Sequence, residues 1–379
     1  MARRQKKKRQ IKYFDYSLLF IIIFLICFGL VMLYSTSAYD AQDTFGDPAH
    51  YLKRQGMAFG MGLAGMFVIS RIDYRRWRNM GNFAYLLASV LCILVLIPGI
   101  GIVHNNSRRW LGIPNSSFEF QPSEFAKLGV IMFLASLICR FPRKMNKFSA
   151  VLRVMVFVLP LFVMIAINNL STAIIVMGIG VAMLFVASPK YWQFLAIGGV
   201  GILGIALFLV LPSAGYRGER VEMWLHPENF VKGYQTLQGL YAIGSGGLFG
   251  KGLGNSMQKL GFVPEAPNDM IFSIICEELG LFGAICVIML FLLLMWRLMI
   301  IANNARDLYG ALIVTGILSH IAIQVILNIA VVTNSIPNTG VTLPFFSYGG
   351  TSVVFLMAEM GLALAVSRGI QFEPEEDYD

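Results

Sequence analysis

Four carboxylates gather where one long apolar segment begins. The stretch VPEAPNDMIFSIICEELG carries Glu265 and Asp269 before the apolar residues and Glu277 and Glu278 among them. A carboxylate at a helix N-terminus is stabilised as the anion by the helix dipole, and an ionised carboxylate can act as a general base. Asp269 is therefore the candidate catalytic residue.

A structural role accounts for the same positions. Pro267 suits a helix start, and Asn268 or Asp269 could cap that helix. Glu277 lies about 12 Å along a helix axis from Asp269, which is too far for the two to share a proton. Because carboxylates inside a membrane must face protein or water, Glu277 and Glu278 are expected to support the site or to pair with polar groups on neighbouring helices.

Basic residues close to this segment could bind an anion. The glycine-rich run AIGSGGLFGKGLGNSMQK (242–259) contains Lys251 and Lys259. It is not a phosphate-binding P-loop, because Ser245 stands where the first glycine is required and Gly252 replaces the final serine or threonine. The run predicts either a flexible loop or a set of backbone N–H groups that receive an anionic headgroup.

A second basic stretch, HNNSRRWLGIPNSSFEFQPSEFAK (104–127), contains Arg108 and Arg109. Paired guanidiniums bind phosphate oxygens well, so this stretch is a further candidate for phosphate contact. Glu124 and Lys127 are three residues apart and could instead form an ion pair within one helix.

Polar residues also recur inside a later apolar segment. His320, Gln324 and Asn328 are four residues apart and form one stripe along a helix, and Glu359 lies midway through the next segment. We favour interhelical hydrogen bonds for this stripe over the wall of a polar cavity. The intervening stretch, 334–348, carries two prolines and an aromatic run, which predict a structured loop.

Composition indicates the environment of these residues. Hydrophobic residues make up 57% of the 379 residues, charged residues make up 13%, and the mean hydropathy is +0.68. Apolar runs of membrane-spanning length recur throughout, so we expect an all-α polytopic membrane protein with ten spans. The expected spans are 17–39, 55–70, 81–103, 122–140, 151–168, 170–187, 191–212, 269–296, 308–333 and 349–367.

The distribution of Lys and Arg sets the expected topology. With both termini in the cytoplasm, 20 basic residues lie inside and 9 outside. The expected parts are a basic cytoplasmic N-terminus (1–16), a ten-helix membrane domain (17–368) and an acidic cytoplasmic tail (369–379). A large extracytoplasmic loop, 213–268, separates helices seven and eight. Because the basic residues stand beside spans, the net charge of +9 does not indicate a nucleic-acid partner.

Three blocks together resemble a known family. QPSEFAKL (121–128), the run from GYQTLQGL to ICEELG (233–280) and IPNTGVTLPFFSYGGTS (336–352) look like the signature blocks of the shape, elongation, division and sporulation (SEDS) family. Their order and spacing match over essentially the whole chain. The run GLGNSMQKLGFVPEA is more similar to the cell-division member, or to its sporulation relative, than to the rod-shape member.

The resemblance implies a bacterial peptidoglycan glycosyltransferase of the cytoplasmic (inner) membrane. Such an enzyme polymerises lipid II into glycan strands on the outer face of that membrane, beside a class B penicillin-binding protein and other division proteins. It implies no organic cofactor, but it does imply help from a divalent cation, Mg²⁺ or Mn²⁺. Two departures exist: Pro267 and Asn268 replace a His-Thr pair, and Asn169 stands where the family often has an acidic residue.

The resemblance also assigns roles. The family's critical aspartate maps onto Asp269, which would take the proton from the acceptor's sugar hydroxyl as it attacks the anomeric carbon of the donor, with inversion in one displacement. Cations would stabilise the departing pyrophosphate. The candidates for phosphate contact are Arg109, Lys127, Arg217, Arg220, Lys251 and Lys259.

Two other functions are open at this point. A lipid II flippase would want charged residues lining a path across the membrane, rather than a base at its outer boundary. A non-catalytic scaffold for division proteins would leave the arrangement of carboxylate and cations unexplained. We therefore favour the polymerase, with the flippase as the alternative.

Overall fold

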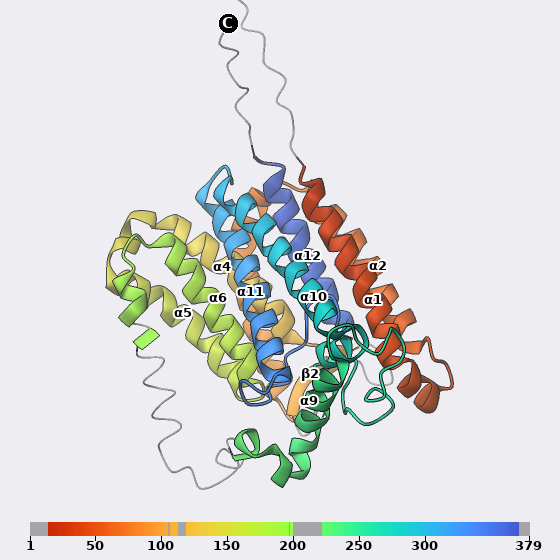
Figure 1. The fold of residues 1–379 in the computed structure, drawn as a ribbon. Helices are drawn as coiled ribbons and strands as arrows, with labels where there is room; N and C mark the ends of the chain where they lie inside the picture. Colours follow the sequence, from red (N-terminus) through yellow and green to blue (C-terminus); the bar gives the residue numbers. More distant parts are fainter. Residues whose placement is uncertain (1–13, 105–106, 113–118, 197, 200–221, 371–379) are drawn as a thin grey trace, which may run out of the picture.

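Long apolar helices make up most of the chain, as its composition predicts (Figure 1). The computed structural model describes residues 14–104, 107–112, 119–196, 198–199 and 222–370. The long helices are α1 (Tyr16–Phe45), α2 (His50–Arg71), α3 (Gly81–Leu96), α4 (Pro122–Arg140), α5 (Phe148–Ala166), α6 (Leu170–Ala187), α10 (Ile271–Asn303), α11 (Leu308–Val332) and α12 (Gly350–Ser367). The shorter elements are the 3₁₀ turns η1 (Tyr74–Met80), η2 (Pro142–Asn146), η3 (Pro227–Asn229) and η4 (Val231–Gly233), the helix α9 (Tyr234–Gly246), and the strands β1 (Gly101–His104), β2 (Ser107–Gly112) and β3 (Glu119–Phe120).

Eight helical segments of the described chain are long and apolar enough to cross a membrane. They are α1, η1 joined to α3, α4, α5, α6, α10, α11 and α12. The 22-residue helix α2 covers the expected second span but is not among these eight. Most of the expected seventh span, 191–212, lies outside the described residues. The protein is a multi-pass membrane protein, and the number of ten spans stays a prediction.

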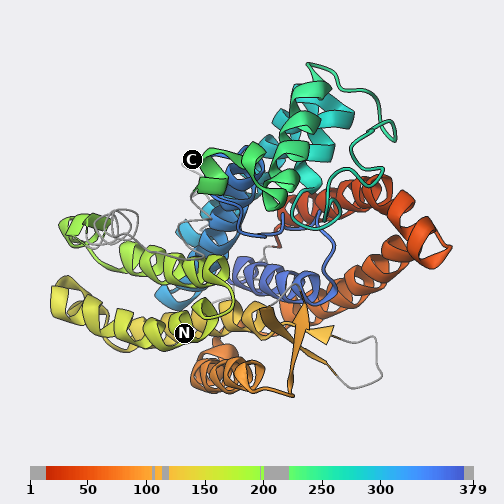
Figure 2. The same ribbon diagram turned by 90° about the horizontal axis from the view of Figure 1, so that it is seen from below.

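The centre of the bundle consists of α4, α11 and α12, which are the most buried of these spans. In both views, α1 and α2 lie on one side of this centre, and α5 and α6 lie on the other (Figure 1, Figure 2). Contacts between α2 and α12, and between α3 and α4, join the outer helices to the centre. The polar side chains of the central helices are therefore surrounded by protein rather than by lipid.

The first and last described helices meet at one end of the bundle. The backbone N–H of Asp15 donates to the Ser367 hydroxyl at 3.4 Å, and Arg297 forms an ion pair with the Asp15 carboxylate at 2.7 Å. Asp15 also caps α1 by accepting a hydrogen bond from the backbone N–H of Leu18. An even number of crossings must separate two ends that lie on the same side, and the predicted ten spans satisfy this condition.

The prediction of an all-α protein needs one correction. The expected third span runs to residue 103, but α3 ends at Leu96, and a small antiparallel sheet in the order β1-β2-β3 follows it. Pro98 cannot donate a helix hydrogen bond, and Gly99 has a φ of 94°, which ends the helix in a tight turn. The two arginines that the sequence singled out lie on β2 of this sheet.

Candidate active site

Asp269 lies directly before α10, at the end of the bundle opposite the meeting point of the first and last helices. α10 begins at Ile271, and its N-cap position is Met270, without a side-chain capping bond. The expectation that Asn268 or Asp269 caps this helix is therefore wrong. The side chain of Asn268 donates to Glu265 instead, and the Asp269 carboxylate accepts a hydrogen bond from Gln235.

Three segments hold Asp269. Gln235 on α9 donates from Nε2 to the Asp269 Oδ1 at 3.3 Å. Asn328 on α11 donates from Nδ2 to the Asp269 backbone carbonyl at 2.8 Å. Gly340, in the loop between α11 and α12, lies so close that a Cβ on it would be 3.7 Å from Oδ2. The residue is 8% exposed, so a sugar hydroxyl can reach only one edge of the carboxylate.

The electrostatics of Asp269 differ from the sequence-based expectation. Burial, and to a smaller extent the neighbouring Glu265 carboxylate, raise the pKa of Asp269 from 3.8 to about 7. The hydrogen bond from Gln235 and the charge of Arg109 oppose this shift without cancelling it. Loss of hydration outweighs any stabilisation of the anion by α10, because the carboxylate does not bind the helix N-terminus.

The loop between α11 and α12 is structured, as its sequence predicts. Asn328 donates to the Val341 carbonyl at 2.7 Å, and Gln324 donates to the Thr342 carbonyl at 3.0 Å. Gln55 on α2 holds the far end of the loop through the backbone of Ser347 and Gly349. The backbone N–H of Tyr348 donates to the Pro267 carbonyl at 2.9 Å, so this loop and the segment before α10 are held together.

An open hollow lies beside β2. It has a volume of about 530 Å³ and is lined by Leu96, Val103, Arg108, Ile167 and Asn168. The adjacent Arg109 donates from Nε to the Asn168 carbonyl at 2.9 Å. A hollow with apolar walls and arginines at its edge suits an amphipathic ligand that has a lipid tail and an anionic head.

Asn169, which stands where the family often has an acidic residue, caps α6. Its Oδ1 accepts a hydrogen bond from the backbone N–H of Thr172 at 3.1 Å. The amide supplies the acceptor that a helix N-terminus requires, so a carboxylate is not needed there for the fold.

Lys127 is buried inside the bundle, with only 1% of its surface exposed. Its amine forms the intrahelical ion pair with Glu124 at 3.0 Å and donates to Gln324 Oε1 at 3.2 Å. The structural interpretation of this pair is confirmed. The predicted phosphate contact of Lys127 stays a prediction that this geometry does not favour.

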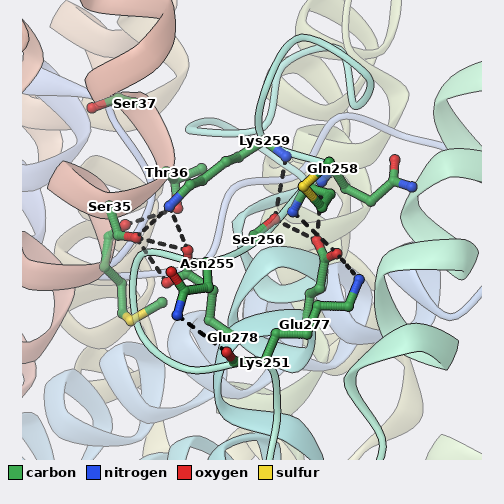
Figure 3. A network of polar contacts seen from close by, with 12 residues as sticks. Ser35, Thr36, Ser37, Lys251, Asn255, Ser256, Gln258, Lys259, Glu277 and Glu278 are labelled. Atoms are coloured by element: carbon green, nitrogen blue, oxygen red, sulfur yellow. Dashed lines mark hydrogen bonds and ion pairs between the residues drawn. The ribbon is translucent and has the colours of Figure 1, made fainter.

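The two lysines of the glycine-rich run each pair with a glutamate of α10 (Figure 3). Lys251 contacts Glu277 at 2.6 Å, and Lys259 contacts Glu278 at 2.7 Å. Ser35 on α1 also donates to the Glu278 carboxylate, at 2.7 Å. Both glutamates are fully buried, so these lysines neutralise charges that the protein itself has buried.

The backbone of the same run forms hydrogen bonds with α10 at the point where that helix is interrupted. Gly280 has a φ of 66° inside the helix, so the helix is interrupted there. The N–H groups of Lys251 and Gly252 donate to the Glu277 and Glu278 carbonyls, both at 2.9 Å, and Leu281 donates to the Gly247 carbonyl at 2.9 Å. The run that was expected to be a flexible or anion-binding loop is therefore held against α10. Four of its N–H groups donate to that helix, those of Lys251, Gly252, Met257 and Gln258.

The remaining predicted cations, Arg217 and Arg220, lie outside the described residues. Of the residues that contact Asp269, Asn328 belongs to the polar stripe predicted from the sequence, whereas Gln235 was not predicted. A single glutamine on a short helix gives no periodic signal, and only the fold brings it to Asp269.

The arrangement defines a class of protein: a polytopic membrane protein with a buried acid–base group and arginines at one end of its bundle. The family model described as "Cell cycle protein", which covers FtsW, RodA and SpoVE, matches residues 16–371. This chain belongs to that family.

Individual relatives agree with this assignment. The chain is 42% identical to Stage V sporulation protein E of Bacillus subtilis, over 93% of this chain and 97% of the relative. It is 37% identical to the probable peptidoglycan glycosyltransferase FtsW of Trichlorobacter lovleyi, over 97% of each chain.

Solved structures show the same fold. A chain from a structure of a peptidoglycan synthase complex matches with a TM-score of 0.78 and 28% identity, over 94% of this chain and 98% of that one. The rod shape determining protein RodA of Thermus thermophilus matches with a TM-score of 0.67 and 26% identity, over 94% and 97% of the two chains.

Proposed function

We propose that this chain is a peptidoglycan glycosyltransferase that polymerises lipid II on the outer face of the bacterial cytoplasmic membrane, during division or sporulation. Its relatives include proteins named as FtsW glycosyltransferases and a sporulation protein. The observation that carries the proposal is a carboxylate with a pKa of about 7, at the same end of the bundle as an arginine-edged hollow.

Asp269 acts as the general base. A group whose pKa lies near the operating pH is ionised in a useful fraction of molecules and still accepts a proton with adequate driving force. The acceptor's sugar hydroxyl gives its proton to Asp269 while its oxygen attacks the anomeric carbon of the donor. The bond from that carbon to the pyrophosphate breaks in the same step, which inverts the configuration.

The donor's pyrophosphate gains negative charge as the anomeric C–O bond breaks, and this charge must be stabilised. Arg108 lines the hollow and Arg109 lies at its edge, so these two residues are placed to bind it. The polyprenyl tail follows the apolar wall formed by Leu96, Val103 and Ile167. A single displacement needs no second carboxylate, in keeping with Glu277 being engaged by Lys251.

A divalent cation, Mg²⁺ or Mn²⁺, would accompany the pyrophosphate and offset its charge. Among the described residues, no group of three His, Cys, Asp or Glu side chains is placed to hold such an ion. We therefore assign no protein ligand to it and derive no step through it.

A class B penicillin-binding protein is the proposed partner, together with other division proteins. One solved relative belongs to a complex that coordinates polymerization and crosslinking. Coupling of this kind would place a crosslinking enzyme beside the outer end of the bundle, where new glycan emerges.

Purified protein with its transpeptidase partner, supplied with labelled lipid II in liposomes, tests the proposal. We expect glycan ladders, and we expect Asp269→Asn to abolish them while keeping the elution profile and unfolding temperature of a folded protein. Asp43→Asn, which changes an exposed acid near the end of α1, is the control and should polymerise normally. Lipid II translocation without polymer would instead identify a flippase, and full-length ladders from Asp269→Asn would remove Asp269 as the base.

A further inference from the structure

The polar stripe of α11 continues into a buried network at the centre of the bundle. His320 is 3% exposed, Gln324 is 4% exposed and Glu359 on α12 is fully buried. His320 Nδ1 lies 2.7 Å from Glu359 Oε2, and His320 Nε2 lies 2.8 Å from Gln324 Oε1. Lys127 and its partner Glu124, both on α4, are the other charged groups that face this network.

The orientation of the Gln324 amide follows from its other contacts. Gln324 Nε2 lies 3.0 Å from the backbone carbonyl of Thr342, and a carbonyl can only accept a hydrogen bond. The amide oxygen therefore faces His320 Nε2 and the Lys127 amine. Because that oxygen also only accepts, His320 Nε2 must carry a hydrogen.

The other ring nitrogen shares a proton with Glu359. A single proton between His320 Nδ1 and Glu359 Oε2 leaves the pair neutral overall, whichever atom holds it. The second oxygen of Glu359, Oε1, is buried without a hydrogen-bond partner. Among the described residues, His320 is therefore the only hydrogen-bond partner of the Glu359 carboxylate.

The network ends at the loop beside Asp269. Gln324 holds the backbone of Thr342, and Asn328, one turn further along α11, holds the adjacent Val341 and the Asp269 carbonyl. The position of this loop thus depends on the orientation of the Gln324 amide. That orientation is supported by two donors to the amide oxygen, His320 Nε2 at 2.8 Å and the Lys127 amine at 3.2 Å.

We propose that His320, backed by Glu359, is a positioning residue that fixes the α11–α12 loop next to Asp269 through the Gln324 amide. This inference rests on the proposed polymerase function. His320 touches neither Asp269 nor the hollow beside β2, so its effect on the reaction is transmitted entirely through Gln324 and Thr342. Without His320, the Gln324 amide oxygen keeps the longer hydrogen bond from Lys127 but loses the shorter one, so Gln324 is held less firmly and the loop gains freedom beside the base.

Three substitutions of His320 test whether this position requires a hydrogen-bond donor or only side-chain volume. A glutamine places an N–H near the former Nε2, an asparagine places one only near the former Nδ1, and a leucine places none. We expect His320→Gln to keep most of the kcat for glycan polymerisation. His320→Asn and His320→Leu should each lose roughly tenfold to a hundredfold, as a small misplacement of a reacting group does, with KM for lipid II within about twofold of the wild type because no substrate contact is removed.

The control is Ser319→Ala, a buried neighbour on α11 whose hydroxyl bonds only to its own helix, at the Thr315 carbonyl. It should leave kcat unchanged. All rates are normalised to folded protein, measured by the monodisperse fraction and the unfolding temperature.

Equal kcat values for the Gln and Asn variants, or an unchanged kcat for His320→Leu, would overturn the positioning role. ¹⁵N spectra of histidine-labelled protein give a second readout, independent of activity. They should show a proton on Nε2 of His320 at neutral pH, assigned by loss of the signal in His320→Gln, and an unprotonated Nε2 would also overturn the proposal. If wild-type protein forms no polymer, the proposed function fails, while the spectra still test the hydrogen-bond network.

Discussion

Asp269 and the pair Glu277–Glu278 belong to one short stretch of sequence, yet their surroundings are opposite. Each of the two glutamates is fully buried and contacts its own lysine, at 2.6 and 2.7 Å. The hydrogen-bond partner of the Asp269 carboxylate is the neutral amide of Gln235, and burial raises its pKa to about 7. The glutamates are thus fixed as part of the scaffold, whereas Asp269 can still exchange a proton.

This contrast separates two uses of a buried acid. A carboxylate that has its own cation forms an ion pair that joins segments of the chain, here α1, α10 and the run before α10. In a buried carboxylate without a neutralising cation, the charged form is destabilised by burial. Such a group is useful where a proton must be taken up and released. Perturbing each type of acid should therefore affect a different property of the protein.

The largest expected effect is on stability, from breaking the pair that contains Glu278. Lys259→Met should lower the free energy of unfolding by about 3–5 kcal/mol, because it leaves a buried carboxylate unneutralised. Thermal unfolding in detergent measures the change. The double variant Lys259→Met/Glu278→Leu should recover most of the loss, since it removes the charge as well. Lys53→Met, which disrupts an exposed pair with Asp47, should change little. A loss in the double variant as large as in the single one would contradict the assigned role.

The second effect is on activity, through the ionisation of Asp269. The base must be deprotonated, so kcat/KM should fall as the pH drops through about 7, by about tenfold for each further pH unit. Glycan synthesis at saturating and limiting lipid II gives the profile. Glu265→Gln should move the profile to lower pH, because it removes a neighbouring charge that raises the pKa of Asp269. A profile that is flat between pH 5 and pH 8 would exclude Asp269 as the titrating base.

Stability should respond to the same ionisation with the opposite sign. The folded-state pKa of Asp269 lies above the ordinary aspartate pKa of 3.8, so the folded protein binds this proton more tightly than the unfolded chain does. The stabilisation is fully present below the unfolded pKa and is lost as the pH rises through about 7. Asp269→Asn should therefore unfold at a higher temperature than the wild type above neutral pH, and the difference should shrink in acid.

The smallest effect concerns the break in α10. Gly280→Ala should destabilise the protein by about 1–3 kcal/mol, because its φ of 66° and ψ of −165° are accessible essentially to glycine alone. A Cβ there would also lie 2.6 Å from the Leu248 carbonyl carbon. Gly244→Ala, in the last turn of α9 where an added Cβ would meet nothing within 4 Å, is the matched control and should be neutral or slightly stabilising. Equal unfolding temperatures for the two variants would show that the break is not required.

The sequence was sufficient for those features that depend on long, uniform patterns. Apolar runs located the helices because a span must be long and nearly free of charge. The stripe of His320, Gln324 and Asn328 was read correctly as a source of hydrogen bonds between segments, since a spacing of four residues fixes a common helix face. The ion pair between Glu124 and Lys127 was predicted for the same reason, because residues three apart share a helix face.

Features that depend on the exact residue at which a helix starts or is interrupted could not be predicted from such patterns. The capping prediction for Asp269 failed because α10 starts two residues later than expected, and a shift of that size changes which atoms face the helix. The partners of Lys251 and Lys259 were missed as well. Their sequence neighbours suggested an anion from outside, whereas the fold places Glu277 and Glu278 of α10 against the two lysines.

The contacts of Asp15 with Ser367 and Arg297 have a mechanical consequence. Helices fastened together at one end can separate only by pivoting there, so displacement grows with distance from the fastening. A tilt of a few degrees moves the far end of α1, a helix of 30 residues and about 45 Å long, by several ångströms. A displacement of that size would widen the bundle at the end where Asp269 lies, while the fastened end keeps its contacts.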